Sequence, residues 1–327
     1  MRVLVVGGAG YVGGATTEVL TAAGHDVTVF DDLSTGHTSA LPPKASLVRG
    51  SILNRDALDA TLSAGYDAVM HFAAKIIVPH SMVDPGSYFE NNISGTINLL
   101  NAMLRHNVTR FVFSSTATVY GEPEVVPITE ASPIQPNNPY GESKATVERL
   151  LAWYASQRGL RYAAPRYFNA AGATERVGEW HQPETHLIPL ALQSAMGLRG
   201  PLTLYGEDYP TPDGTCVRDY VHVLDLADAH LRALDYLQPE GAPSLVCNLG
   251  CGTGYSNRDV LESIRRVTGR AVPLERGDRR PGDAPITVAS NVRAGEVLGW
   301  RPQRGLDDIV GSAWAWLAAH PQGYPTS

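Results

Sequence analysis

Residues 3–13 of the chain read Val-Leu-Val-Val-Gly-Gly-Ala-Gly-Tyr-Val-Gly, and a helical pattern follows to residue 20. The apolar run is typical of a buried strand, so the segment predicts a strand, a glycine turn and a helix in succession. Gly7 and Gly10 would let the backbone approach a pyrophosphate at the N-terminus of that helix, where unpaired N–H groups favour anions. Gly13 would let the helix pack closely against the strand. A glycine turn also occurs where only close packing is needed, so the pattern needs support from its surroundings.

That support comes from a second apolar strand, predicted at residues 25–30, which ends in Asp31-Asp32. A carboxylate at this position can hold the two hydroxyl groups of a ribose. It would also repel a 2′-phosphate. The sequence therefore predicts a site for NAD rather than NADP.

The composition is that of an ordinary globular protein. The chain has 327 residues, of which 43% are hydrophobic and 18% charged, and could form one large α/β unit or two domains. The formal net charge of −7 and the absence of a long basic run argue against nucleic acid or an anionic membrane as a partner. The first strand leaves no room for a signal peptide, and no apolar stretch approaches the roughly 20 residues that span a bilayer. We expect a cytoplasmic protein.

Cysteine and histidine give no strong signal of a metal site. Cys216, Cys247 and Cys251 are an odd number without zinc-ribbon spacing, so buried, reduced thiols are expected rather than a disulfide. The ten histidines show no His-x-x-x-His or comparable cluster. We therefore expect no metal.

Strand and helix patterns alternate through the first half of the chain. Further strands are predicted at residues 46–49, 68–72, 110–114 and 162–167, separated by helical patterns near residues 55–64, 86–106 and 141–158. This order predicts an α/β fold with a doubly wound parallel (Rossmann) sheet. Ligands bind at the carboxyl ends of such strands, where Gly7, Asp31, Phe72 and residues 114–116 fall.

The second half of the chain is richer in glycine and proline, as in residues 209–214. We predict an NAD-binding Rossmann domain at residues 1–168 and a smaller C-terminal substrate-binding α/β region at residues 169–327. A later strand at residues 245–249 is expected to return to the first domain.

Tyr140 and Lys144 stand four residues apart at the start of a predicted helix, so phenol and ammonium would project from one face. A nearby positive charge favours the phenolate and lowers the pKa of the phenol from its usual value of about 10. The pair therefore indicates proton transfer at a hydroxyl group. Such spacing also arises by chance, with a packed ring and a solvated lysine.

Together with Ser114-Ser115-Thr116 at the end of a strand, this pair resembles the Ser/Thr, Tyr, Lys triad of the extended short-chain dehydrogenase/reductase family. Within that family, the chain resembles the UDP-glucose 4-epimerases through residues 166–169, 206–223, 248–250 and 280–283. The resemblance runs nearly end to end, and residues 208–222 are too long a match to arise by chance. That segment also occurs in epimerases of other UDP-sugars, including pentoses.

The resemblance implies an NAD-dependent isomerase that interconverts UDP-glucose and UDP-galactose through a transient 4-keto sugar, as in galactose metabolism. Tyr140 would take the proton from the sugar 4-hydroxyl, Lys144 would lower the pKa of Tyr140 and bond the cofactor ribose, and Thr116 would bind the 4-oxygen. Arg218 and Arg280 would hold the diphosphate, since a guanidinium bonds two oxygens at once. The helices at residues 88–106 and 140–158 would form a homodimer contact.

The same resemblance gives two sets of binding residues. The NAD-binding residues would be Gly7, Gly10, Tyr11, Val12, Gly13, Asp31, Asp32, Leu33, Thr35, Ser51, Ile52, Phe72, Ala73, Ala74, Asn91, Ser114, Tyr140, Lys144 and Tyr167. The UDP-sugar-binding residues would be Thr116, Tyr140, Phe168, Asn169, His186, Leu187, Thr203, Tyr205, Arg218, Tyr220, Arg280, Asp283 and Thr287.

The chain departs from the family pattern at a few positions. Ser51 stands where an acidic residue usually accepts a bond from the adenine amino group, and it would accept that bond more weakly. Lys75 is one place early compared with some members, and His80 replaces a usual glutamate. Thr287 stands where narrow-specificity members have a tyrosine beside the sugar C2 substituent. The smaller side chain predicts some activity on UDP-N-acetylglucosamine and UDP-N-acetylgalactosamine.

Other functions remain as alternatives. A nucleotide-sugar 4,6-dehydratase needs an acidic pair directly after the threonine, and this chain has Ala117-Thr118 there. A net reductase would exchange NADPH, which Asp31 disfavours. A UDP-xylose/UDP-arabinose 4-epimerase is the nearest rival. A non-catalytic NAD sensor would tolerate loss of the triad, all of which is present.

Overall fold

The computed structural model describes residues 1–280 and 283–325. Its chain divides into two compact units. The first unit comprises Met1–Gly121, Pro133–Arg166 and Ala227–Cys247, and the second comprises Glu122–Ser132, Tyr167–Leu226 and Asn248–Ser327. The chain thus passes between the units several times. The domain boundary expected at residue 168 stays a prediction.

The main sheet belongs to the first unit. Within the described residues it has eight strands, in the order β12-β7-β5-β4-β1-β2-β3, with β6 paired to β7. The pairs β1–β2, β2–β3, β1–β4, β4–β5 and β5–β7 are parallel. The strands are β1 (Arg2–Val6), β2 (Asp26–Asp31), β3 (Ser46–Arg49), β4 (Ala68–His71), β5 (Arg110–Phe113), β6 (Ser115–Thr116), β7 (Arg161–Tyr167) and β12 (Leu245–Leu249).

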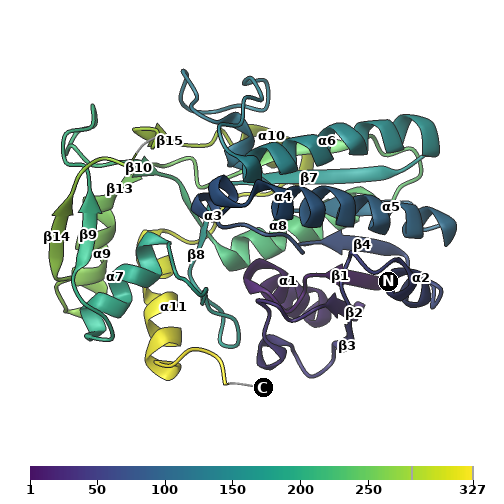
Figure 1. Cartoon of the computed structure of the whole chain (residues 1–327), viewed down its shortest axis with the longest axis horizontal. Helices are drawn as coiled ribbons and strands as arrows, with labels where there is room; N and C mark the ends of the chain where they lie inside the picture. Colours follow the sequence, from purple (N-terminus) through teal and green to yellow (C-terminus); the bar gives the residue numbers. More distant parts are fainter. Residues whose placement is uncertain (281–282, 326–327) are drawn as a thin grey trace. The chain divides into compact units, whose positions relative to one another are not determined.

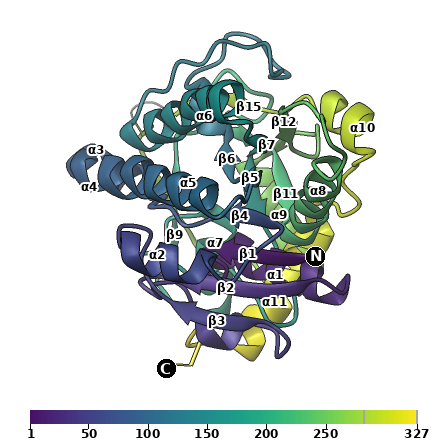
Figure 2. The same ribbon diagram turned by 90° about the vertical axis from the view of Figure 1, so that its right-hand side faces the viewer.

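Helices cover both faces of this sheet, which confirms the predicted doubly wound α/β fold. In Figure 2, α2, α5 and α6 lie on one face, and α1 and α8 lie on the other. The helices near the sheet are α1 (Tyr11–Ala22), α2 (Arg55–Leu62), α3 (Val78–Val83), α4 (Pro85–Tyr88), α5 (Gly95–Arg105), α6 (Pro139–Arg158) and α8 (Val223–Tyr236). Short turns are η1 (Thr38–Ala40) and η3 (Ala117–Tyr120).

Alternating side chains of the strands supply one core on the α2, α5 and α6 face. Leu4 and Val6 of β1 join this hydrophobic cluster with Leu99 of α5 and Val147 of α6, and all four are fully buried. Because successive strand residues point to opposite faces, Val3 and Val5, also fully buried, serve the other face. A strand buried on both faces must be apolar throughout, as residues 3–6 are.

The long helix α6 has clear end signals. The side chain of Asn138 accepts the Gly141 N–H at its N-cap, and Pro139 occupies the first turn. The helix ends at Gly159, which adopts a left-handed conformation with φ 68°. These local signals fix where Tyr140 and Lys144 fall, within the first two turns.

The helix predicted at residues 86–106 is interrupted. A π-type turn, η2 (Phe89–Ser94), separates α4 from α5. Within it, the carbonyl of Asn92 accepts the hydroxyl of Thr96 at 2.6 Å, and the buried Asn92 amide bonds outside the helix. Single π turns inside α-helices occur frequently at functional sites.

The second unit contains more helix than its glycine- and proline-rich sequence indicated. Figure 1 shows α7 (Leu187–Met196), α9 (Asn257–Thr268) and α11 (Leu306–Ala319) beside the strand pair β9–β14. The remaining elements are α10 (Val292–Leu298), β8 (Asn169–Ala171), β9 (Leu202–Tyr205), β10 (Val217–Arg218), β11 (Tyr220–His222), β13 (Tyr255–Ser256), β14 (Leu274–Gly277) and β15 (Ile286–Thr287). Leu192, Ile264 and Ile309 from the three helices share one hydrophobic core.

Two further expectations concern thiols and membranes. All three cysteines lie in the described part of the chain and form no disulfide there, and Cys216 and Cys247 are buried. Within the described ranges, none of the helices combines the length and hydropathy that crossing a bilayer requires.

Candidate active site

The glycine turn after β1 is held close to the end of β4. Gly7 has φ +79°, and a Cβ built on it would lie 2.3 Å from the backbone nitrogen of Ala73. A Cβ on Gly13 would lie 2.2 Å from the carbonyl oxygen of Gly7. Any side chain at either position would force the backbone apart. Only glycine therefore permits this turn, and the turn brings the predicted residues Gly7, Gly13, Phe72 and Ala73 together.

Asp31 lies at the end of β2, with its carboxylate turned toward the glycine turn. Its two oxygens accept the N–H groups of Ala9 and Leu33, each at 2.9 Å. Burial raises the pKa of Asp31, and the two backbone hydrogen bonds oppose that effect. A carboxylate oxygen can accept more than one hydrogen bond, so both oxygens of Asp31 can still accept hydrogen bonds from ribose hydroxyl groups. Asp32 is exposed and accepts the Ser34 N–H.

Other predicted NAD-binding residues lie in the segments that follow β2, β3 and β4. Thr35 is exposed in the loop that follows β2. Ser51 accepts the Leu53 N–H through its hydroxyl at 3.3 Å, and the Ile52 side chain is buried in the core, leaving its backbone for any ligand contact. The ring of Phe72 packs against His230, with centroids 4.9 Å apart.

Lys144 is buried and points to the end of β5. Its ammonium donates a 2.7 Å hydrogen bond to the carbonyl of Ser114 and lies 4.7 Å from the centre of the Phe113 ring. Burial lowers the pKa of Lys144 to about 7, and the charge of Glu148 opposes this effect. The lysine is thus close to losing its proton at neutral pH unless a negative charge forms beside it.

Tyr140 precedes Lys144 by one turn of α6 and is also buried. The start of α6 packs on the segment after β6, since a Cβ on Gly141 would lie 2.8 Å from the Thr118 carbonyl. Thr116 is anchored in that segment, where its hydroxyl accepts the Thr118 N–H at 3.1 Å. The structure therefore gathers the segments that carry Thr116, Tyr140 and Lys144.

Asn92 is a site-supporting residue that the sequence analysis did not identify. Its amide donates to the carbonyl of Lys75 and to the hydroxyl of Ser143, both at 3.0 Å, and accepts the Lys75 N–H. Asn91, which was predicted, donates to the Asn92 side chain. A buried asparagine inside a helical pattern is unfavourable in propensity, and that was the signal available in the sequence.

A buried ion pair lies beneath α6 and was also missed. Glu148 accepts hydrogen bonds from the guanidinium of Arg166 and the hydroxyl of Ser115, and Arg166 also donates to Tyr120 at 2.8 Å. Removing one partner of such a pair would leave a buried charge uncompensated. The pair fixes α6 against β6 and β7, and so positions Lys144.

The second unit gathers several of the residues predicted to bind UDP. The carboxylate of Asp283 lies 3.0 Å from Nε of Arg280 and 3.6 Å from Nη2 of Arg218. The Arg280 guanidinium lies over the ring of Tyr205, 5.2 Å from its centre. Thr287 is the strand partner of Arg218 in the β10–β15 pair. Five predicted residues therefore form one cluster.

Other predicted residues lie on neighbouring elements of that unit. Asn169 pairs with Tyr220 between β8 and β11, and its amide donates to the Asp219 carbonyl at 3.0 Å. Burial raises the pKa of Tyr220 to about 12. Thr203 lies on β9 with Tyr205, and Leu187 begins α7. Phe168 is buried and begins the segment that leads to β8.

His186, which was predicted to bind the UDP-sugar, lies beside two glutamates, and its binding role stays a prediction. Its Nδ1 lies 2.9 Å from Glu179 and 3.0 Å from Glu184, within a group that also contains His181.

Of the predicted NAD residues, Tyr167 falls in the second unit and the others fall in the first.

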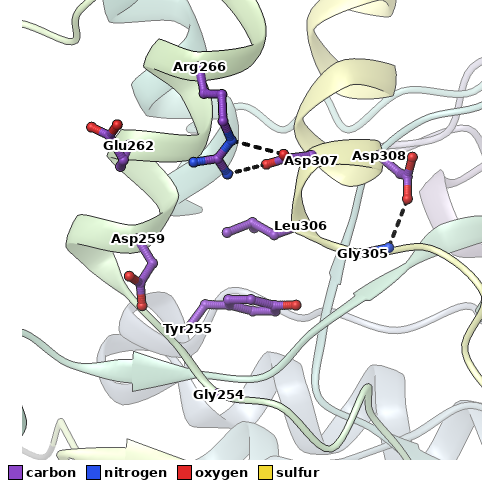
Figure 3. Close-up of a pocket in the computed structure, with 9 residues that line it drawn as sticks. All are labelled: Gly254, Tyr255, Asp259, Glu262, Arg266, Gly305, Leu306, Asp307 and Asp308. Atoms are coloured by element: carbon purple, nitrogen blue, oxygen red, sulfur yellow. Dashed lines mark hydrogen bonds and ion pairs between the residues drawn. The ribbon is translucent and has the colours of Figure 1, made fainter.

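A surface pocket elsewhere in the second unit contains none of the predicted residues. Figure 3 shows its lining, from α9 and the start of α11, with Arg266 paired to Asp307 and the Gly305 N–H bonded to Asp308. Its charged groups already have partners. We assign it no role.

Comparison with known proteins places the chain in a family. The sequence pattern described as the NAD dependent epimerase/dehydratase family matches residues 3–250. The chain belongs to this family.

Relatives of this epimerase/dehydratase chain match over nearly their whole length. The UDP-glucose 4-epimerase of Lacticaseibacillus casei is 48% identical, with 99% of each chain covered. A crystal structure of the UDP-glucose 4-epimerase of Brucella ovis in complex with NAD is 45% identical, with a TM-score of 0.93 and 96% and 97% of the two chains covered. The enzyme of Stenotrophomonas maltophila, solved with NAD and formylated UDP-arabinopyranose, is 38% identical, with a TM-score of 0.95 and 98% and 99% covered.

The residues of this epimerase/dehydratase chain fit NAD. The turn at Gly7 presents bare backbone at the N-terminus of α1, where a side chain has no room, and such a cradle suits a pyrophosphate. Asp31 offers carboxylate oxygens where the adenosine ribose would lie, and it leaves no counter-charge for a 2′-phosphate. Both features lie in the first unit.

Proposed function

We propose that the chain catalyses NAD-dependent 4-epimerisation of UDP-sugars and interconverts UDP-glucose and UDP-galactose. The observation that carries this function is the arrangement of Lys144, which is buried one turn after Tyr140 and hydrogen-bonded to Ser114, two residues before Thr116. Relatives named as UDP-glucose 4-epimerases, at 48% identity over 99% of the chain, support it.

The proton chemistry follows from burial. Taking a proton from the 4-hydroxyl of the sugar requires Tyr140 as phenolate, and the Lys144 ammonium stabilises that charge. Burial lowers the pKa of Lys144 to about 7. A phenolate on Tyr140 would in turn favour the charged form of Lys144. The two groups therefore favour each other's ionised state. Thr116 would hold the 4-oxygen, and NAD supplies reversible hydride exchange at C4 when it is bound.

Inversion at C4 requires the 4-keto sugar to present its opposite face before hydride returns. Tight contacts to the sugar would prevent that rotation, so most of the binding energy must come from the UDP part. Arg218 and Arg280 suit the diphosphate, because each guanidinium can bond two oxygens. Asp283, which contacts both, would orient them when no ligand is bound.

The test uses purified protein without added NAD. It is incubated separately with UDP-galactose, UDP-N-acetylgalactosamine and UDP-arabinose, and the 4-epimers are separated by chromatography. The critical variant is Tyr140→Phe, and the matched control is Tyr154→Phe on the same helix. Conversion that is lost only in Tyr140→Phe supports the proposal. No conversion of any sugar, even after NAD is supplied, would reject it and return attention to a non-catalytic NAD sensor.

A UDP-pentose 4-epimerase is the second candidate. The observation that favours it is the Stenotrophomonas maltophila structure, which was solved with formylated UDP-arabinopyranose. Faster turnover of UDP-arabinose than of UDP-galactose in the same assay would favour this function.

We also propose a cytoplasmic homodimer. The helices expected at its contact carry Trp153, which is 67% exposed on α6, and Phe89, which is 37% exposed in η2. Tryptophan and phenylalanine are enriched at protein–protein interfaces. Light scattering of the wild type and of Trp153→Lys should give the mass of a dimer and of a monomer. Cell fractionation tests the location.

A further inference from the structure

Four side chains with metal-binding atoms lie together in the second unit, just before α7. They are Glu179, His181, Glu184 and His186. Each offers one ligand atom, and these atoms all lie within 4.8 Å of one another. Within residues 1–280 and 283–325, this is the one group of three or more such side chains.

Distances between the nitrogens and oxygens of this group are close to those of a tetrahedral site. Nδ1 of His186 lies 2.9 Å from Glu179 Oε1 and 3.0 Å from Glu184 Oε1. Nδ1 of His181 lies 3.4 Å from Glu184 Oε2 and 3.8 Å from Glu179 Oε1. Around tetrahedral Zn²⁺ with bonds of 2.0–2.1 Å, neighbouring ligand atoms are about 3.3–3.4 Å apart. The nitrogen–oxygen distances lie on both sides of this value, and the four ligand atoms all lie within 4.8 Å of one another, so side-chain shifts toward a common ion would complete the coordination.

Burial makes the charge of this group costly. The side chains of Glu179 and Glu184 are each 7% exposed. Two buried carboxylates need compensating positive charge, and a divalent cation held with two neutral imidazoles would supply it.

Backbone hydrogen bonds orient one of the ligands. Oε1 of Glu184 accepts the N–H groups of Thr185 and His186 at 2.8 and 2.9 Å. Such outer contacts fix the direction of a ligating carboxylate.

An independent observation concerns His181. Its Nδ1 is buried and has no hydrogen-bond partner, although it faces both carboxylates. A buried polar nitrogen without a partner is costly, and it calls for an explanation such as a missing ion. His186 lies close to both glutamates, whereas Nδ1 of His181 faces the same carboxylates at 3.4 and 3.8 Å without a hydrogen bond. A bound ion would give this nitrogen a partner.

We propose that Glu179, His181, Glu184 and His186 bind one Zn²⁺ ion through two imidazole nitrogens and two carboxylate oxygens. Zn²⁺ suits this ligand set and geometry, whereas Mg²⁺ and Ca²⁺ prefer more ligands, all of them oxygen. The four protein ligands leave no open position, so the ion is structural and ties residues 179–186 to the start of α7. The site does not depend on the proposed epimerase activity.

No metal was expected from the sequence, because its histidines show no His-x-x-x-His spacing. The ligands instead follow the pattern Glu-x-His-x-x-Glu-x-His in a segment without regular structure. Only the fold of that segment brings them together.

The test begins with full-length protein stripped of metal by a chelator and dialysed. Zn²⁺ is added by calorimetric titration, and bound zinc is then measured by elemental analysis after gel filtration. The variants are His181→Gln and Glu179→Gln. The control is His106→Gln, whose imidazole also lies 3.0 Å from a carboxylate, that of Asp59, but outside the group. We expect one zinc per chain in the wild type and the control, and a loss of at least tenfold in affinity in both variants.

Cobalt provides a second readout. Co²⁺ in the wild type should show the intense visible bands of a tetrahedral ion, and these should disappear in His181→Gln. Wild-type protein that is folded by circular dichroism yet retains no zinc would overturn the proposal and leave ion pairing only. Zinc retained equally by both variants, or the weak spectrum of octahedral Co²⁺, would also overturn it. Because the wild type alone can give the negative result, a variant that fails to fold does not decide the outcome.

Discussion

The ammonium of Lys144 donates a 2.7 Å hydrogen bond to the carbonyl of Ser114. This contact joins the first two turns of α6 to the end of β5, the edge at which a parallel sheet places its ligands. It also holds the lysine, one helical turn after Tyr140, in buried surroundings that lower the pKa of Lys144 to about 7. The charge that the proposed mechanism requires of Lys144 is therefore one that the fold makes costly.

Replacing Lys144 should remove the charge that stabilises the Tyr140 phenolate. We expect Lys144→Met to lower kcat by roughly 100-fold or more, as for the loss of a general base at neutral pH. The remaining activity should rise with pH, because the phenol then ionises without help. The measurement is the pH profile of kcat with added NAD. Lys44→Met, at an exposed position, is the control and should match the wild type.

The two arginines should govern the affinity for UDP rather than the chemical step. Lysine keeps the charge at either position but loses the fork of hydrogen bonds. A hydrogen bond to a charged group contributes about 1.5–3 kcal/mol, so Arg218→Lys and Arg280→Lys should each weaken UDP binding about 10- to 100-fold in calorimetry. Arg276→Lys, on a side chain that is 87% exposed, should change nothing. Equal affinity in all three variants would contradict the assigned roles.

Thr287 should set the size of the sugar that the enzyme accepts. Its side chain is small and lies beside Arg218 in the strand pair β10–β15. We expect Thr287→Tyr to lower kcat/KM for UDP-N-acetylgalactosamine at least tenfold while leaving UDP-galactose nearly unaffected. Thr287→Val, of similar volume, should behave like the wild type. The prediction is wrong if the wild type acts on the non-acetylated sugars alone and Thr287→Tyr changes nothing.

His71 should make the protein sensitive to acid. Burial, followed by the charge of Lys144, lowers the pKa of His71 to about 3, whereas an unfolded chain has a histidine pKa of about 6.5. As the pH falls from 6.5 toward 3, the unfolded state binds a proton that the folded state does not. Stability should then fall by about 1.4 kcal/mol per pH unit, or about 2 kcal/mol at pH 5.

The measurement for His71 is urea unfolding at pH 7 and pH 5. His71→Gln keeps a side chain that can bond Thr96, as His71 does at 2.9 Å, but it does not titrate. Between pH 7 and pH 5, the wild type should lose about 2 kcal/mol more of its free energy of unfolding than His71→Gln loses. His80→Gln, at an exposed position, should follow the wild type. An identical loss in His71→Gln would show that other groups control acid stability.

Much of the fold could be read from local patterns. The strands predicted at residues 3–6, 25–30, 46–49, 68–72, 110–114 and 162–167 lie within one residue of their observed bounds. Strands buried on both faces are apolar throughout, and helices alternate with them along the chain. The hydrophobic pattern and the order of the elements therefore suffice to predict a doubly wound sheet. The placement of Tyr140 and Lys144 on one helix could be predicted in the same way, since residues four apart lie on one helical face.

The sequence by itself determined the alternating elements, the glycine turn and the pairing of Tyr140 with Lys144, because each depends on neighbours within a few residues. Only the tertiary structure decided what each buried polar group bonds. It placed Asn92 against Ser143, Glu148 against Arg166, and Glu179 against His186. Such contacts depend on how separate segments pack or how an irregular loop folds, and neither has a period that a sequence displays.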